Sequence, residues 1–282
     1  MAQQAGGQDW LEIWRNMYDA ERAQGEAVTD PAFERYADTW RGRAQHYATA
    51  GRRNPQPDSF MAWLTPRLRP TDTVADVGAG SGRYLPYLAR LVAQVIAVEP
   101  SPSMRAELER TLADEGLTNV RVLAEDWPLT QPCSADVVIS AHVVYGVREV
   151  GPFLAALDAA TTRLCALYLG LRHPTWAMAP FWERIHGVER LPLPAALEAL
   201  AACHQLDLPA RLDLVPAPVA FRYLDQAEAL EELRARLRLA PDVRQDAALQ
   251  AAIDELLVFN DDGTLAPRVQ QRHAGVVWWE KA

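Results

Sequence analysis

The stretch Val74–Arg83 reads VADVGAGSGR and decides the fold class of this 282-residue chain. A short apolar run contains an acidic residue, Asp76, and is followed by three glycines, Gly78, Gly80 and Gly82. Glycine lets the backbone turn with positive φ and lets a ligand approach closely. In open α/β sheets, nucleotide-like ligands bind at turns beyond the carboxyl ends of the strands. The stretch therefore predicts a strand, a ligand-binding turn and the start of a helix.

From residue 73 onward the apolar runs are short and rich in β-branched residues, and helical patterns separate them. The expected strands are 74–77, 95–98, 120–124, 137–140 and 164–171, and the expected helices are 84–91, 103–115 and 150–161. Strands that alternate with helices predict βαβ units and a mostly parallel sheet. Because helices cover both faces of such a sheet, its strands have continuous apolar runs.

Both flanking segments read mainly as helix. Towards the N-terminus, apolar residues at helical spacing predict helices over 10–18, 33–47 and 59–68, with a break at 25–31 in which Asp30 would cap the second helix. Residues 174–194 are rich in aromatics and prolines and predict a lid or insertion. Beyond it we expect helices over 195–204, 226–239 and 243–259, a strand-like stretch over 211–223, a turn at 260–263 and a last strand over 269–279.

These patterns predict two units: an N-terminal helical cap over residues 1–69 and a ligand-binding α/β domain over 70–282. The lid insertion would occupy about residues 173–194 of the second unit. Aromatic residues and histidines in that insertion, which could line a substrate or simply fill space, are His173, Trp176, Phe181, Trp182 and His186.

Composition narrows the classes of partner. A formal net charge of −9, a pI near 5.2 and the lack of a dense Lys/Arg run disfavour a nucleic-acid partner. The cysteines Cys133, Cys165 and Cys203 lie far apart, which favours a reducing compartment and neither a disulfide framework nor a metal site. No signal-peptide pattern and no apolar run of about 18 residues is visible, so we expect a cytoplasmic protein without a membrane span.

The spacing of the glycines distinguishes between two cofactors. Dinucleotide-binding folds use G-x-G-x-x-G to place a pyrophosphate at a helix N-terminus. In this chain Arg83 stands at the position of the third glycine, and Gly82 comes one residue early. The carboxylate of Asp76, expected to face the mouth of the turn, suits the ammonium group of a methionine moiety and would repel a pyrophosphate. The pattern therefore favours S-adenosylmethionine over NAD.

The stretch DVGAGSG resembles motif I of the class I S-adenosylmethionine-dependent methyltransferases. VIAVEPS at 95–101 is similar to that family's second strand, whose final acid, Glu99 in this chain, binds both ribose hydroxyls. VLAEDWP at 122–128 resembles the adenine-binding motif, and DVVISAHVVY at 136–145 resembles the fourth strand. The four elements occur in the family's order and cover residues 70–172.

The resemblance implies a doubly wound α/β fold with a mostly parallel seven-stranded sheet and an antiparallel last strand. It implies S-adenosylmethionine as cofactor, S-adenosylhomocysteine as product and no metal. Asp126 would accept a hydrogen bond from the adenine amino group, and Trp127 would lie along the ring. The cofactor-binding candidates are Asp76, Gly78, Ala79, Gly80, Gly82, Glu99, Pro100, Met104, Glu125, Asp126, Trp127 and Ala141, together with Arg43 and Tyr47 of the N-terminal helix, which would reach the methionine carboxylate.

His142 and Tyr145 follow the fourth strand, where an acceptor would present its nucleophile, and are the catalytic candidates. A general base there could deprotonate a hydroxyl or an amine. Alternatively, His142 only closes the pocket, since transfer to a neutral amine or a thiolate needs little beyond alignment and desolvation. Asp136 is expected to be structural, and Cys133 precedes the fourth strand and is therefore not a nucleophile.

The predicted reaction is direct in-line methyl transfer to an oxygen, nitrogen, sulfur or carbon atom of a small molecule. The fourth strand lacks D-P-P-Y and N-P-P-Y, which disfavours nucleic-acid and glutamine methylation. Two alternatives stay open, an NAD(P)-dependent oxidoreductase and a non-catalytic module that binds S-adenosylmethionine. The acceptor and the oligomeric state are left open by the sequence.

Overall fold

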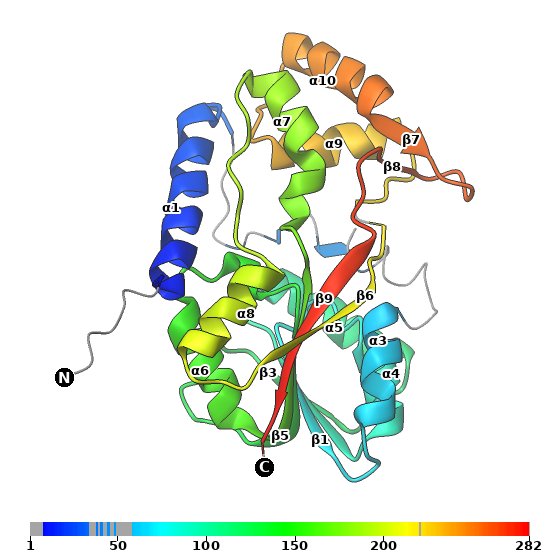
Figure 1. The fold of residues 1–282 in the computed structure, drawn as a ribbon. Coiled ribbons are helices and arrows are strands. Elements are labelled where there is room, and N and C mark those ends of the chain that lie inside the picture. The colour runs from blue at the N-terminus through cyan, green and yellow to red at the C-terminus, as the bar shows by residue number, and fades with distance from the viewer. Residues whose placement is uncertain are drawn as a thin grey trace, which may run out of the picture.

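A seven-stranded sheet forms the centre of the protein (Figure 1). The computed structural model describes residues 8–33, 38, 40–41, 44–45, 48, 58–219 and 221–281. In spatial order the strands are β3 (Val120–Leu123), β2 (Gln94–Val98), β1 (Thr73–Val77), β4 (Ala135–Ala141), β5 (Thr161–Gly170), β9 (His273–Glu280) and β6 (Arg211–Pro216). The strands from β3 to β5 pair in parallel, whereas β9 runs antiparallel to both β5 and β6. The predicted parallel sheet with an antiparallel last strand is confirmed.

The strand order reverses direction at β1, which pairs with β2 on one side and with β4 on the other. Such a switch point opens a crevice at the carboxyl ends of the strands, because the connecting segments leave to opposite sides. Asp76 lies near the end of β1, beside Ala97 of β2 and Ile139 of β4. The glycine turn therefore lies where an open α/β sheet binds its ligand.

Two helical layers cover the sheet (Figure 1). On one face lie α6 (Val150–Ala160) and α8 (Ala196–Gln205), and α1 (Trp10–Val28) packs against both. On the other face lie α3 (Ser59–Leu64), η1 (Thr65–Arg67), α4 (Leu85–Leu91) and α5 (Pro102–Asp114). Alternate residues of β1 contribute to the two layers: Ala75 and Val77 to the first cluster and Val74 to the second. Burial on both faces explains the continuous apolar runs.

A separate helical lobe stands over the carboxyl ends of the parallel strands (Figure 1). It consists of η3 (Pro174–Met178), α7 (Ala179–His186), α9 (Gln226–Arg236), α10 (Val243–Leu256) and the hairpin of β7 (Leu257–Phe259) and β8 (Leu265–Pro267). These elements share a third hydrophobic cluster that includes Phe181, Trp182, Tyr223, Leu233 and Ile253. The insertion predicted at 173–194 is thus one part of a larger lobe that the segment between β6 and β9 completes.

The predicted break at 25–31 begins too early, because α1 continues through Gly25 to Val28. A Cβ atom at Gly25 would lie 2.3 Å from Cζ of Arg238. Glycine is needed there for the close approach of a guanidinium group rather than to end the helix. Asp30 does accept a hydrogen bond from the Ala32 N–H at 2.8 Å, whereas most of the predicted helix 33–47 lies outside the described residues.

The other corrections concern where elements end. The strand predicted over 211–223 ends at Pro216, and Tyr223 forms only an isolated bridge with Leu265. The helix predicted to reach residue 259 ends at Leu256, because residues 257–259 pair with 265–267 as a hairpin. The last strand begins at His273 rather than at 269, and the helix predicted over 59–68 is split into α3 and η1.

Candidate active site

The glycine turn after β1 is left-handed at each of its glycines. Gly78, Gly80 and Gly82 have φ values of 78°, 57° and 82°. The backbone N–H groups of Gly78 and Ala79 donate to the Val98 carbonyl oxygen at 2.8 and 3.0 Å, which fixes the turn to the end of β2. A Cβ at Gly80 would meet no atom within 4 Å. The turn is thus anchored on one side and leaves open space at Gly80 for a ligand.

Glu99 lies over this turn, as the sequence predicts. Its side chain is buried, and its two oxygens accept hydrogen bonds from the N–H groups of Gly80 and Ser101, both at 2.8 Å. Each carboxylate oxygen can accept a second hydrogen bond, so the group still suits a vicinal diol. Burial raises the pKa of Glu99 against the lowering effect of these hydrogen bonds. The bonds hold the carboxylate in one orientation.

Asp76 is buried beneath the turn rather than open at its mouth. The residue is 1% exposed, and its Oδ2 has no hydrogen-bond partner among the described residues. Burial, and secondarily the charge of Glu99, raises the pKa of Asp76 to about 7. The carboxyl is therefore only partly ionised at neutral pH, unlike the anion that the sequence predicts. An orphaned buried acceptor is costly, and a cationic ligand group would both satisfy and ionise it.

The segment after β3 presents its acids to solvent. Glu125 and Asp126 are exposed, and Glu125 Oε2 accepts a hydrogen bond from the Thr130 N–H at 3.2 Å. Trp127 is half-buried, and its Nε1–H donates to the Phe153 carbonyl oxygen of α6 at 3.3 Å. The indole is thus anchored to a helix of the first layer, while Asp126 stays open to a ligand.

The remaining cofactor candidates differ in accessibility. Pro100 is exposed, Ala141 is half-buried at the end of β4, and Met104 is 4% exposed in the core. The Met104 N–H donates to Ser101 Oγ at 3.1 Å, so Met104 lies in the first turn of α5, which Ser101 caps. Met104 therefore supports the turn from behind. Arg43 and Tyr47 lie outside the described residues.

Asp38 fastens the N-terminal segment to the loop that follows Glu99. Its carboxylate accepts hydrogen bonds from Ser101 Oγ at 2.9 Å and from the Ser103 N–H at 3.0 Å. Burial acts against the shift, but these bonds and one from the Trp40 N–H lower the pKa of Asp38 to about 2. A lone aspartate in a helical pattern carries no sequence signal of such a contact, so the sequence did not predict it.

His142 occupies an unusual backbone position directly after β4. Its φ of 60° is left-handed, which costs a residue with a Cβ of the order of 1–3 kcal/mol. Its N–H donates to the Tyr168 carbonyl oxygen at 2.9 Å, and its ring centroid lies 4.7 Å from that of Tyr168. The residue is exposed, yet the surrounding protein desolvates the imidazole and, with the charge of Arg83, lowers its pKa to about 4. The imidazole is therefore neutral. Its backbone has the kind of strained conformation that is common at functional sites.

Tyr145 is buried, and its hydroxyl oxygen accepts a hydrogen bond from the Gly170 N–H. Burial raises the pKa of the phenol, so it stays neutral. Its ring meets the His173 ring edge-to-face at 4.7 Å and lies 6.0 Å from that of His142. This arrangement suits positioning of the two histidines and does not suit the general base that the sequence analysis considered.

Arg83, which replaces the third glycine of a dinucleotide motif, belongs to a polar cluster beside His142. Its Nη2 pairs with Asp58 Oδ2 at 3.0 Å, and the same oxygen accepts a hydrogen bond from the Tyr84 hydroxyl at 2.9 Å. Asp58 also caps α3 through the Met61 N–H at 3.0 Å. The sequence analysis used Arg83 only as a departure from a motif, because its partner lies 25 residues earlier in the chain.

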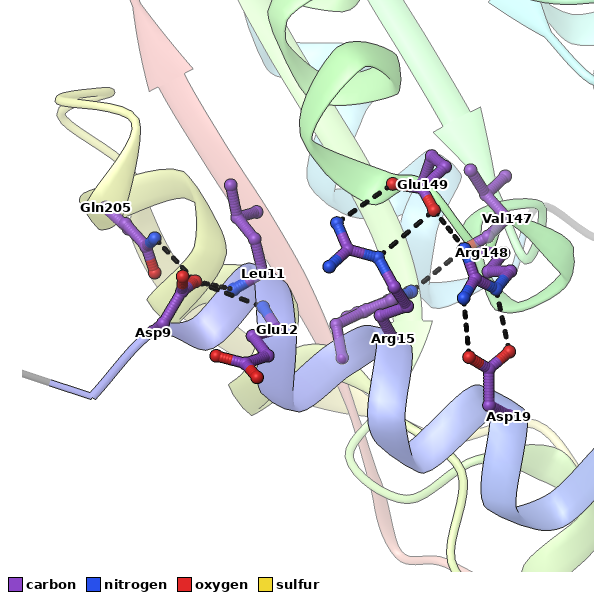
Figure 2. Close-up of polar contacts among 10 residues, drawn as sticks. Asp9, Leu11, Glu12, Arg15, Asp19, Val147, Arg148, Glu149 and Gln205 are labelled. Carbon is purple, nitrogen blue, oxygen red and sulfur yellow. Dashed lines mark hydrogen bonds and ion pairs between the residues drawn. The ribbon is translucent and has the colours of Figure 1, made fainter.

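Helix α1 holds the loop that follows His142 and Tyr145 (Figure 2). The indole Nε1–H of Trp14 donates to the Val147 carbonyl oxygen at 2.8 Å. Two ion pairs join the same elements: Arg15–Glu149 at 3.0 Å and Asp19–Arg148 at 2.6 Å. The helix itself begins at Trp10 because Asp9 accepts hydrogen bonds from the N–H groups of the first turn. Helix α1 thus supports the loop that follows the two catalytic candidates.

The aromatic residues predicted to form a lid have mostly structural positions. Phe181 and Trp182 are buried in the third cluster, and the His186 ring contacts Trp182 at 4.5 Å. Trp176 lies beside the guanidinium of Arg172, whose Cζ is 4.7 Å from the ring centroid. Of this set, His173 is the residue that contacts Tyr145. Asp136 has the expected structural role, since it accepts a hydrogen bond from the Thr73 N–H at 2.8 Å.

Residues 75–162 match a family model described as a methyltransferase domain. The match covers the glycine turn, Glu99, the segment after β3 and the whole of β4, and the sheet has the seven strands and the antiparallel last strand that the resemblance implies. Over residues 75–162 the chain therefore carries a methyltransferase domain. Within it, Asp76 near the end of β1 precedes the glycine turn, and Glu99 after β2 accepts a hydrogen bond from the Gly80 N–H of that turn.

Curated relatives match the methyltransferase domain over part of their length. The protein-L-isoaspartate O-methyltransferase of Gloeobacter violaceus is 38% identical over 79 residues, 27% of this chain and 38% of that protein. The enzyme of that name from Roseiflexus castenholzii is 30% identical over 128 residues, 45% of this chain and 46% of that protein. The chain thus spans less than half the length of these relatives.

Solved structures share the fold at low identity. A putative methyltransferase from Bacillus halodurans superposes with a TM-score of 0.52 at 13% identity, over 79% of this chain and 99% of that one. The YcgJ protein of Bacillus subtilis gives a TM-score of 0.51 at 14% identity, over 78% and 97%. At this identity they show the fold of the methyltransferase domain alone. Within the described residues, no helix is both long and apolar enough to cross a membrane.

Proposed function

We propose that this protein is a methyltransferase that binds S-adenosylmethionine and transfers its methyl group to a small-molecule acceptor. The observation that carries the proposal is the buried, unpartnered Oδ2 of Asp76 beneath a glycine turn that has open space at Gly80. A cationic amino-acid tail satisfies that oxygen. A pyrophosphate would bring like charge to it and to Glu99, which disfavours the dinucleotide alternative.

Different residues of the site would bind different parts of the cofactor. Asp76 would hold the ammonium group of the cofactor, Glu99 the ribose hydroxyls and Asp126 the adenine amino group. When bound, the cofactor supplies an electrophilic methyl group on a sulfonium sulfur. Arg83 stands near His142 with its charge balanced by Asp58. We assign Tyr47 and Arg43 no position, since they lie outside the described residues.

His142 is the residue of this set best placed to hold a proton from the acceptor. Its low pKa keeps the imidazole neutral at physiological pH, so a ring nitrogen is free to accept a proton. With a pKa of about 4 it is a weak base, which suits an acceptor that needs alignment more than deprotonation. Tyr145 would fix the orientation of the acceptor pocket through Gly170 and His173.

Two features favour a small acceptor. The helical lobe stands over the carboxyl ends of the parallel strands, where a macromolecular substrate would have to enter (Figure 1). The net charge of −9 disfavours a polyanionic partner. The relatives named as protein methyltransferases match over less than half of their length. We therefore place a small organic molecule between His142 and the lobe.

Calorimetric titration of the full chain tests the cofactor first. We expect micromolar binding of S-adenosylhomocysteine and no binding of NADH. Binding of NADH without S-adenosylhomocysteine would overturn the proposal in favour of an oxidoreductase. Turnover is tested next, by transfer of a labelled methyl group to a panel of small acceptors. Tight binding without transfer to any acceptor would favour the non-catalytic module.

A further inference from the structure

Arg190, in the segment after α7, carries a buried positive charge at the junction of the helical lobe and α1. Its side chain is 7% exposed, and Nη2 donates to Glu21 Oε1 of α1 at 2.7 Å. Its Cζ lies 4.5 Å from the ring centroid of Trp182. Its Nε–H is buried without a hydrogen-bond partner among the described residues. One edge of the guanidinium is thus paired, and the donor at Nε is not.

A second unsatisfied donor belongs to the ring that Arg190 covers. Trp182 is completely buried, and its indole Nε1–H also has no hydrogen-bond partner in the described part of the chain. Buried donors without acceptors are rare in native proteins and call for an explanation. Two of them on side chains in contact indicate that an acceptor group from outside the chain belongs there.

The local charge balance indicates the same kind of partner. Arg236 and Arg238 are the cations that act most strongly on Arg190, and Glu21 is the acid that does so. Arg236 pairs with Glu232 at 3.0 Å, and Arg238 packs against the backbone of Gly25. The charged groups that act on Arg190 are thus two further guanidinium groups and one carboxylate, that of Glu21. Burial, and then these cations, lowers the pKa of Arg190 in spite of Glu21.

The cationic cluster is connected to the proposed acceptor site through His173. The His173 ring contacts Tyr145, which in turn lies beside His142. Burial, the charge of Arg190 and that of His142 together lower the pKa of His173 to about 3. His173 is thus within electrostatic reach of both groups. The ring contacts through Tyr145 and the electrostatic effects on His173 thus link His142 to Arg190.

We infer that Arg190 and the Trp182 indole N–H bind an anionic group, a carboxylate or a phosphate, of the methyl acceptor. This inference rests on the proposed function and names the class of its substrate. A guanidinium fork matches the geometry of both anions, and the indole N–H supplies a third donor. Glu21 holds Arg190 in place before the acceptor arrives. The anionic group anchors the acceptor and takes no part in methyl transfer.

The competing explanation is that the pair of Arg190 and Glu21 only fastens the lobe to α1. The two explanations predict different effects of removing the Glu21 carboxylate. If Arg190 binds an anion, Glu21→Gln leaves a guanidinium that binds external anions more tightly. If the pair is only structural, the same change lowers stability and creates no response to anions.

The experiment uses the full chain and three probes of similar shape: benzoate, phenyl phosphate and neutral benzamide. Each is titrated by calorimetry, with and without saturating S-adenosylhomocysteine. We expect at least one of the anions to bind at least 10-fold more tightly than benzamide. The tighter of the two anions identifies the acceptor group as a carboxylate or a phosphate. Equal binding of all three probes, or no binding of either anion, would overturn the inference.

Three variants locate the anion. Arg190→Gln should reduce anion affinity at least 10-fold, whereas Glu21→Gln should increase it several-fold. Arg222→Gln is the matched control, because Arg222 forms its ion pair with Asp262 at the surface and should leave anion binding unchanged. If Arg190→Gln does not fold, Glu21→Gln still decides, since unchanged anion affinity in that variant contradicts the inference.

Failure of this inference and failure of the proposed function give different results. Loss of S-adenosylhomocysteine binding by the wild-type chain contradicts the proposed function whatever the anions do. Binding of S-adenosylhomocysteine without preference for the anions contradicts only the assignment of Arg190 and Trp182.

Discussion

The sheet domain and the helical lobe each hold an unsatisfied buried polar group at the place where we propose that a ligand group binds. Beneath the glycine turn the orphaned atom is an acceptor, Asp76 Oδ2. In the lobe the unsatisfied atoms include two donors on side chains in contact, Arg190 Nε and Trp182 Nε1, and an acceptor elsewhere, Gln245 Oε1. A cationic cofactor tail suits the first region and an anionic acceptor suits the second.

The two regions also differ in how the sequence encodes them. The cofactor side is built from short motifs, each at the end of one strand, whose parallel pairing brings them together. The lobe assembles from η3, α7, α9, α10 and a hairpin, which come from two distant parts of the chain. Local motifs are visible in a sequence, whereas a pocket assembled from separate segments is not.

Asp76→Asn should give the largest change on the cofactor side. Loss of a charge-assisted hydrogen bond of about 1.5–3 kcal/mol predicts a 10- to 100-fold weaker affinity for S-adenosylhomocysteine, measured by calorimetry. The matched control is Asp136→Asn, since Asp136 binds the Thr73 N–H and not a ligand. It should lower stability and keep the affinity. Unchanged affinity in Asp76→Asn would contradict the proposal that a cationic ligand group binds beneath the glycine turn.

The affinity for S-adenosylhomocysteine should also depend on pH. At acid pH its loss should be comparable to that caused by Asp76→Asn. Because Asp76 has a pKa of about 7 and must be ionised to bind a cation, affinity should rise about 10-fold per pH unit up to pH 7 and then level off. Proton release, measured in buffers of different ionisation enthalpy, should accompany binding below pH 7. An affinity that is flat between pH 5.5 and 8.5 would contradict the role of Asp76, and Asp76→Asn should flatten the profile.

The raised pKa of Asp76 also predicts how the stability of the ligand-free protein depends on pH. The folded pKa of Asp76 lies above the unfolded value of 3.8, so the folded state binds more protons between those values. Stability should therefore fall as pH rises from about 4 to about 7, by up to a few kcal/mol at about 1.4 kcal/mol per pKa unit. Thermal unfolding should show a smaller fall for Asp76→Asn than for the wild-type chain.

Gly80→Ala should separate strain from ligand contact. Gly80 and Gly116 both have positive φ, and a Cβ at either would meet no atom within 4 Å. Alanine should cost each site about 1–2 kcal/mol of stability through backbone strain. Only Gly80→Ala should weaken S-adenosylhomocysteine binding, by about 10-fold, because the new methyl group enters the ligand's space. Equal affinities in the two variants would place the ligand elsewhere.

Trp14→Phe should give the smallest change, on the acceptor side. It removes the hydrogen bond from α1 to the Val147 carbonyl oxygen and should cost about 1 kcal/mol of stability. The rate of methyl transfer should fall several-fold, with unchanged affinity for S-adenosylhomocysteine. Trp10→Phe is the control, since Trp10 is half-buried at the start of the same helix and lies one turn before Trp14. A change in cofactor affinity with Trp14→Phe would show that the two sides are coupled.

The sequence was a good guide wherever a periodic pattern or a motif decided the structure. It predicted β1 to β5 to within a few residues, the antiparallel last strand and the position of Glu99 over the glycine turn. It placed a helix break at Gly25, because a glycine that admits a distant guanidinium looks the same as one that ends a helix. It also extended α10 over residues that pair as β7, because short apolar runs fit either structure.

By itself, the sequence determined the sheet, its order of motifs and the acids at the ends of β1 and β2, since these depend on hydrophobic periodicity and on side chains next to their own strands. The tertiary structure decided everything that required distant segments to meet. It buried Asp76 and raised its pKa, paired Arg83 with Asp58, and brought Arg190 onto Trp182 and Glu21. Burial and pairing depend on the whole surroundings of a group, and a linear pattern does not contain those surroundings.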